Sequence, residues 1–114
     1  MLTFNLKKEW FEKIKSGEKT HEYRELKPYW TRRFEKEFGK LEFCITELRY
    51  GNPKFFKTQH LVCFMNGMLS EKRKPRLYAK LKSVSLKYGM QTDLKINAPV
   101  YDIEFELTKE SKQE

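Results

Sequence analysis

The stretch VYDIEFEL, residues 100–107, alternates between apolar and acidic side chains without a break. The apolar set is Tyr101, Ile103, Phe105 and Leu107, and the acidic set is Asp102, Glu104 and Glu106. A period of two is typical of a strand that turns one face to the core and the other to solvent. We therefore predict a strand here, with the apolar set inward and the acidic set outward.

Two more strands are predicted upstream of this one. RLYAKLKSVSL (76–86) alternates in the same way, with Leu77, Ala79 and Leu81 inward and Lys80 and Lys82 outward. HLVCFM (60–65) is a short apolar run closed by the turn pair Asn66-Gly67, and residues 87–99 are rich in turn formers. No helical pattern separates these strands, so we expect them to be antiparallel.

The first forty residues carry two helical patterns instead. Leu6, Trp10 and Ile14 recur every four residues, and Gly17 stands just past the end of that stripe. Asn5 is a candidate N-cap for this first helix. A second stripe of Trp30, Phe34 and Phe38 follows Pro28, which suits the first turn of a helix, and precedes Gly39.

Together these patterns predict an α+β protein. LTFN (2–5) and residues 19–24 add two short strands, while LEFCITELRY (41–50) fits a strand or a continuation of the second helix. We expect a small, partly open β-barrel of five to six mostly antiparallel strands, flanked by two or more helices. It forms a single domain over 1–108, with a variable insert at 40–59 and a frayed tail at 109–114.

The composition is that of a folded, non-exported protein. The 114 residues are 39% hydrophobic and 15% aromatic, which permits a core despite the 35% of charged residues. No apolar run is long enough to span a membrane or to act as a signal peptide. Cys44 and Cys63 fit buried free thiols in a reducing cytoplasm. Neither they nor His21 and His60 have metal-ligand spacing, so we expect a cytoplasmic monomer without metal or cofactor.

The net charge of +8 is concentrated in one part of the chain. Residues 60–90 contain seven basic residues and one acidic residue. Such a cluster fits a polyanion, most simply nucleic acid, with Lys72, Arg73, Lys74 and Arg76 gripping phosphates. The alternatives are a solvated loop that keeps the protein in solution and a loop that meets an acidic protein partner.

Residues 16–25, SGEKTHEYRE, are the strongest candidate site. The alternating segment 19–24 is polar on both faces, which indicates a strand along a cleft or an edge rather than inside a closed core. Arg24 can hold a phosphate or a carbonyl, and Glu22 can accept hydrogen bonds from an exocyclic amine or act as a general base. Lys19 can act as a base or nucleophile if its pKa falls. Alternatively, Glu22 pairs with Lys19 or Arg24 and merely ties the strand to a neighbour.

Two further groups are weaker candidates. In YWTRR (29–33), aromatic rings stand beside Arg32 and Arg33, a combination that suits base stacking with phosphate contact, although Trp30 also lies on the apolar stripe. Asn66 could bind a base edge, but an Asn-Gly pair is first of all a hairpin turn.

The spacing of Gly17, Lys19, Glu22 and Arg24 resembles the signature of ASCH domains, which belong to the PUA-like superfamily. FMNG (64–67) and the closing strand 100–107 resemble two further family features. The resemblance implies a PUA-like β-barrel, a cleft between barrel and helices, and RNA or nucleotides as ligands. One bacterial branch is similar to amidohydrolases that act on N4-acetylcytidine. Lys19 falls on the catalytic lysine of that branch, and Glu22 stands where it has a catalytic threonine.

Three functions follow as hypotheses. The first is a domain that binds RNA or a modified nucleotide around Lys19, Glu22 and Arg24. The second is a small hydrolase of a modified nucleoside or RNA in which Lys19 and Glu22 are the catalytic residues. The third is a protein-interaction module that uses its basic loop. The resemblance favours them in this order.

Overall fold

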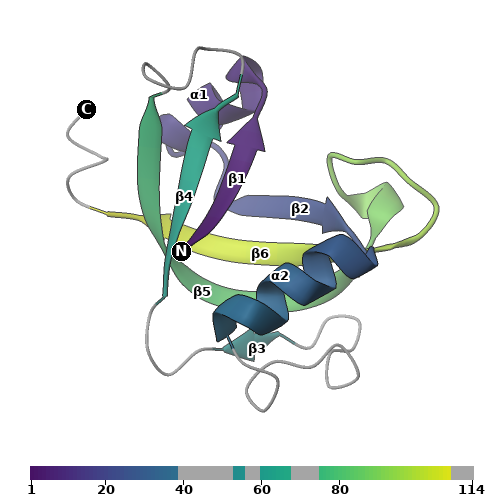
Figure 1. The fold of residues 1–114 in the computed structure, drawn as a ribbon. Coiled ribbons are helices and arrows are strands. Elements are labelled where there is room, and N and C mark those ends of the chain that lie inside the picture. Colours follow the sequence, from purple (N-terminus) through teal and green to yellow (C-terminus); the bar gives the residue numbers. More distant parts are fainter. Residues whose placement is uncertain (39–52, 56–59, 68–74, 109–114) are drawn as a thin grey trace.

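A computed structural model describes residues 1–38, 53–55, 60–67 and 75–108 (Figure 1). In these segments the strands are β1 (Leu2–Leu6), β2 (His21–Glu25), β3 (Lys54–Phe55), β4 (Leu61–Asn66), β5 (Arg76–Tyr88) and β6 (Pro99–Leu107). The helices are α1 (Lys8–Lys15), α2 (Pro28–Phe38) and a short 3-10 turn, η3 (Gly89–Gln91).

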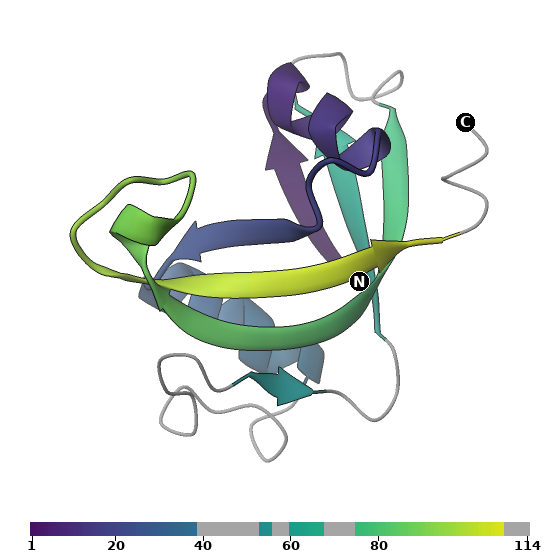
Figure 2. The same ribbon diagram turned by 180° about the vertical axis from the view of Figure 1, so that it is seen from behind.

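The strands form a mixed, curved sheet with the order β1-β4-β5-β6-β2, and β3 pairs with β5 off this path. β1 and β4 are parallel, and the other pairs are antiparallel. Figures 1 and 2 show that β1 and β4 are steeply inclined to β2 and β6, while β5 curves through both parts. The predicted α+β class and partly open barrel are therefore confirmed at this level.

A bulge in β5 accounts for part of this curvature. Leu81 pairs with Phe105 and Ser83 with Glu104, so Lys82 has no counterpart on β6. Before the bulge the strand alternates as predicted, with buried Leu77, Ala79 and Leu81. After it, residues 83–86 are all buried. A bulge increases local twist, which allows one long strand to serve both parts of the half-barrel.

The core is rich in aromatic rings. Phe4 stacks on Phe64 with ring centroids 5.6 Å apart, and Phe64 packs on Phe105 at 4.6 Å. α2 begins at Pro28, as predicted, and its buried Phe34 meets Tyr101 edge-on at 4.7 Å. The inward positions Tyr101, Ile103 and Phe105 of β6 are buried, as the alternation predicts.

The start of α1 differs from the prediction. Asn5 is not its N-cap, and Leu6 is not on its apolar stripe, because both residues belong to β1 and pair with Met65 and Asn66 of β4. These sheet hydrogen bonds keep the chain extended as far as Leu6. The helix then begins at Lys8 with Lys7 as its N-cap and buries Phe11 and Ile14.

The polar strand starts later than predicted. β2 begins at His21, not at Lys19, because the Lys19 amide donates to the carbonyl of Lys13 at the end of α1. Gly17 makes this reversal possible, since its φ of 85° lies in the left-handed region that favours glycine. Lys19 therefore lies in the connection between α1 and β2, outside the strand.

Asp102 points away from the core, as predicted, but it is only 4% exposed. His21 Nδ1–H donates to one carboxylate oxygen at 2.7 Å, and the Lys87 ammonium contacts the other at 3.0 Å. Burial raises the pKa of Asp102, but the hydrogen bonds from His21 and Lys87 outweigh burial and hold it below its ordinary value. The outer face of β6 is thus partly covered by polar neighbours from β2 and β5.

Several expectations fall on segments that the structure does not describe. They include the element at 41–50, Cys44, most of the insert at 40–59, and the tail at 109–114. Cys63 is a buried free cysteine, as expected, and burial raises the pKa of its thiol. Neither α1 nor α2, the α-helices of the described segments, has the length and apolar character needed to cross a membrane.

Candidate functional site

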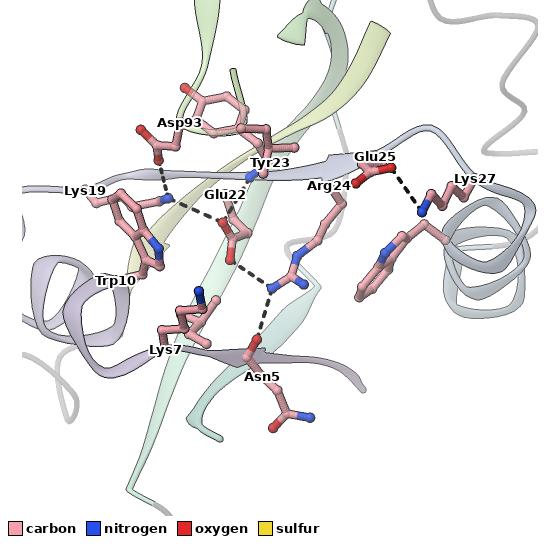
Figure 3. A pocket seen from close by; sticks show the side chains of 13 residues that line it. Asn5, Lys7, Trp10, Lys19, Glu22, Tyr23, Arg24, Glu25, Lys27 and Asp93 are labelled. Atoms are coloured by element: carbon pink, nitrogen blue, oxygen red, sulfur yellow. Dashed lines mark hydrogen bonds and ion pairs between the residues drawn. The ribbon is translucent and has the colours of Figure 1, made fainter. Parts of the chain in front are cut away.

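A pocket opens at the gap between β1 and β2, the two ends of the sheet path. Its volume is about 400 Å³. It is lined by Asn5, Leu6, Lys7, Trp10, Lys19, Glu22, Tyr23, Arg24, Glu25, Lys27, Trp30, Asp93 and Leu94. These residues come from β1, α1, β2, α2 and the loop after η3. We call this space the seam pocket (Figure 3).

Glu22 is the central charged group of the seam pocket. Its side chain is only 6% exposed, and its two carboxylate oxygens contact different cations. One oxygen lies 3.4 Å from the Lys19 ammonium and accepts from the Tyr23 amide at 3.0 Å. The other accepts from Arg24 at 3.0 Å. A buried carboxylate with several donors is fixed in position, so Glu22 presents a rigid acceptor.

Lys19 connects this carboxylate to the loop after η3. Its ammonium also contacts Asp93 at 2.5 Å. It lies over the ring of Trp10 at 4.7 Å and near that of Tyr23 at 5.6 Å. Figure 3 shows Trp10, Lys19 and Asp93 gathered at one end of the pocket. Lys19 therefore holds α1, β2 and the loop together through charge and cation–π contacts.

Arg24 closes the other side of the seam. Its guanidinium lies 5.1 Å from the Phe4 ring and 5.0 Å from the Trp30 ring. One terminal nitrogen donates to Glu22 and, at 3.3 Å, to the main-chain carbonyl of Asn5. The buried Nε has no hydrogen-bond partner within the part of the chain that the structure describes. Arg24 thus connects β1 and β2, and its Nε–H has no acceptor among the described residues.

The rim adds further charge. Lys27 pairs with Glu25 at 3.1 Å on the exposed side of β2. Lys7 extends from the end of β1 toward the same space (Figure 3) and forms no ion pair with any described residue. Burial, followed by the nearby Asp102 carboxylate, raises the pKa of Tyr23, so its hydroxyl keeps its proton at neutral pH. The pocket therefore combines a free cation, fixed ion pairs and aromatic walls.

The predicted site residues are only partly brought together. Lys19, Glu22 and Arg24 meet in the seam pocket, as the first hypothesis expects. The ion-pair alternative is observed, because Glu22 pairs with both Lys19 and Arg24. Glu22 also lines the pocket, and a ligand role for these three residues stays a prediction. No group of three or more metal-ligating side chains occurs in the described segments.

The other candidates lie elsewhere. Arg32 is exposed on α2, and Arg33 lies beside Trp30 but outside the pocket lining. Asn66 is buried as the last residue of β4, and Arg76 begins β5 and contacts Met65. Neither lines the seam pocket. Lys72, Arg73 and Lys74 fall outside the described residues, so their predicted role stays a prediction.

Sequence reasoning missed several lining residues. The sequence places Trp10 on an apolar helical stripe. The one available signal of a pocket position is that this helix directly precedes residues 16–25. Asp93 and Leu94 lie in a turn-rich segment with no local signal. They reach the pocket because the loop between β5 and β6 folds back to the Lys19 ammonium, which is a long-range contact.

Fold and pocket define this chain as an α+β half-barrel with a charged, aromatic-walled pocket at its seam. Comparisons with protein-family models, with curated proteins and with solved structures found no match.

Proposed function

We propose that this protein is an ASCH-type domain with a PUA-like barrel, and that its seam pocket binds a nucleobase, free or within RNA. One observation carries the proposal: a fixed Glu22 carboxylate lies between Lys19 and Arg24, and the indoles of Trp10 and Trp30 line the same pocket. The pattern of Gly17, Lys19, Glu22 and Arg24 supports the family assignment.

The chemistry of the pocket suits a base. Bases are planar and stack on aromatic rings, while their edges offer hydrogen-bond donors and acceptors. Glu22 can accept from an exocyclic amine, and the Arg24 guanidinium can donate to a carbonyl or a phosphate. Lys7 at the rim can contact a phosphate. The volume of about 400 Å³ lies within the usual range for small-molecule sites.

The hydrolase alternative uses the same residues, but it also requires Lys19 to lose a proton. Lys19 would have to act as a neutral amine, whereas its ammonium contacts both Glu22 and Asp93. Binding requires no such loss of a proton. We therefore propose binding as the function, with turnover of a modified nucleoside as the alternative to be tested in the same experiment.

The test is an amide and indole chemical-shift titration of labelled protein. The ligands are the four nucleoside 5′-monophosphates, N4-acetylcytidine and a short single-stranded RNA. We expect shifts at residues 19–24 and at the indole groups of Trp10 and Trp30. Glu22→Gln should abolish these shifts, whereas Glu12→Gln, the same change at an exposed position of α1 outside the pocket lining, should preserve them.

Two outcomes would contradict the proposal. One is that no ligand shifts any resonance of the seam pocket. The other is that shifts occur only outside it and disappear when salt is added, which would indicate nonspecific polyanion contact. Release of cytidine from N4-acetylcytidine, abolished by Lys19→Ala, would replace binding by the hydrolase alternative.

A further inference from the structure

A group of aromatic rings and arginines leads out of the seam pocket. Phe4 and Trp30 stack on each other with centroids 5.3 Å apart, and Arg24 lies beside both rings. Arg33 lies 5.2 Å from the Trp30 ring and 5.7 Å from the Tyr29 ring. Trp30 and Tyr29 meet edge-on with centroids 5.1 Å apart. We call these five residues, Phe4, Arg24, Trp30, Arg33 and Tyr29, the aromatic–arginine ladder.

The ladder runs from the core to the surface. Phe4 is fully buried, Trp30 is partly buried and lines the pocket, and Tyr29 is 54% exposed. The exposed ring is nevertheless held in place, because Arg33 donates a hydrogen bond to the Tyr29 hydroxyl at 3.2 Å. An oriented, exposed ring loses little conformational entropy when another flat group stacks on it.

The charges beside the ladder fit a polyanion. Arg32, Arg33 and Lys36 on α2 form no ion pair with any residue in the described ranges. An exposed aromatic ring beside arginines is a combination by which proteins bind single strands, since bases stack on the ring and phosphates meet the cations. A purely acidic peptide would satisfy the cations but leave Tyr29 without a stacking partner.

We propose that Tyr29 and Arg33 form a second nucleotide subsite, so that the ligand is a single-stranded oligonucleotide. One base occupies the seam pocket, and the adjoining base stacks on Tyr29 with a phosphate at Arg33. Tyr29 and Trp30 are adjacent rings, which places the two subsites next to each other along a strand. This inference rests on the proposed function, and it adds that a free nucleotide is only part of the ligand.

The experiment compares dissociation constants for the four nucleoside 5′-monophosphates with those for homopolymeric tetranucleotides of RNA and of DNA. Tetranucleotides should bind at least tenfold more tightly than the matching monophosphate. Tyr29→Ala should weaken tetranucleotide binding roughly 5- to 100-fold, as expected for the loss of one stacked base, and should change monophosphate binding less than about twofold. The RNA and DNA arms show which strand chemistry is preferred.

Matched variants separate the ladder from general charge. Arg33→Ala and Arg32→Ala remove the same charge from adjacent positions of α2, but only Arg33 belongs to the ladder. Arg33→Ala should therefore weaken tetranucleotide binding several-fold more than Arg32→Ala. Circular dichroism and urea unfolding of each variant confirm that the fold is intact.

The outcomes distinguish the two proposals. Monophosphate binding without any gain for tetranucleotides, or a gain that Tyr29→Ala leaves unchanged, would overturn the second subsite alone. Absence of binding by every nucleotide and oligonucleotide would overturn the proposed function as well. Displacement of the tetranucleotide by poly-glutamate at an equal concentration of charges would also overturn the subsite, because that peptide has no bases.

Discussion

Glu22 illustrates how one residue serves both the fold and the candidate site. It is buried on β2 and forms ion pairs with both Lys19 and Arg24. We predict that Glu22→Gln lowers the free energy of unfolding by about 2 kcal/mol, because it leaves two cations with fewer charged hydrogen bonds. Urea unfolding followed by tryptophan fluorescence measures this.

The matched control for this change is Glu25→Gln. The Glu25–Lys27 pair is largely exposed, so its loss should change stability by at most about 1 kcal/mol. Equal effects of the two substitutions would show that Glu22 is no more important to the fold than an ordinary surface ion pair.

Asp102 makes the stability of the fold depend on pH. Its folded-state pKa is held below the ordinary value of 3.8 by His21 and Lys87, despite burial. A depressed carboxyl pKa contributes stability above the unfolded value, and this contribution is lost as the pH falls through the folded value. We predict that wild type exceeds Asp102→Asn in stability by about 1.5–3 kcal/mol at pH 6.

The pH profile is the decisive measurement for Asp102. The difference between wild type and Asp102→Asn should shrink as the pH falls below 3.8. A difference that grows on acidification would contradict the assigned direction of the pKa shift.

Among the elements, the loop from η3 to β6 is the part of the pocket lining that lies farthest along the sequence from the other lining residues. Gly89 starts η3, and a Cβ added there would lie 2.5 Å from the Ile96 carbonyl oxygen and 2.8 Å from that of Ala98. We predict that Gly89→Ala destabilises the protein by about 1–3 kcal/mol through overpacking. It should also weaken ligand binding, because Asp93 and Leu94 of this loop line the pocket.

Met90→Ala is the control for the loop, since Met90 is adjacent and exposed. It should change unfolding and binding little. Wild-type affinity in Gly89→Ala would mean that the position of Asp93 does not matter to the ligand.

The elements also show how far the sequence alone leads. Alternation identified the inward residues of β6 and of β5 up to the bulge, and the aromatic stripe identified α2. Alternation gave the wrong exposure where contacts between residues distant in the sequence determine burial. Asp102 was expected in solvent, yet His21 and Lys87 arrive from two other strands and cover it. The Lys19–Glu22–Arg24 cluster is recognisable in the sequence because its three members are close together along the chain. The apolar stripe around Trp10 indicates a core position, and nothing in the sequence around Asp93 indicates a pocket.

At the scale of the whole molecule, the net charge of +8 should govern how binding responds to salt. Each phosphate neutralised on a single strand contributes about −0.7 to the slope of log affinity against log salt. We predict a slope of about −2 for a tetranucleotide that contacts about three phosphates. For a 5′-monophosphate it should be less steep than about −1.

Titrations at several salt concentrations measure these slopes. Arg33→Ala should reduce the tetranucleotide slope, whereas Tyr29→Ala should lower affinity and leave the slope unchanged, because it removes a ring and no charge. Slopes near zero for both ligands would contradict any electrostatic contribution to binding.

The pairing of the sheet also sets the order in which the chain can fold during synthesis. Residue 2 pairs with residue 62, and residue 21 pairs with residue 104, so the strands beside the pocket acquire their partners only late. Such distant pairings make folding slow compared with that of locally connected proteins. The ribosome therefore releases Lys19, Glu22 and Arg24 long before their pocket can exist. A nascent chain that lacks β6 should not retain ligand, and ligand binding then reports that synthesis has passed β6.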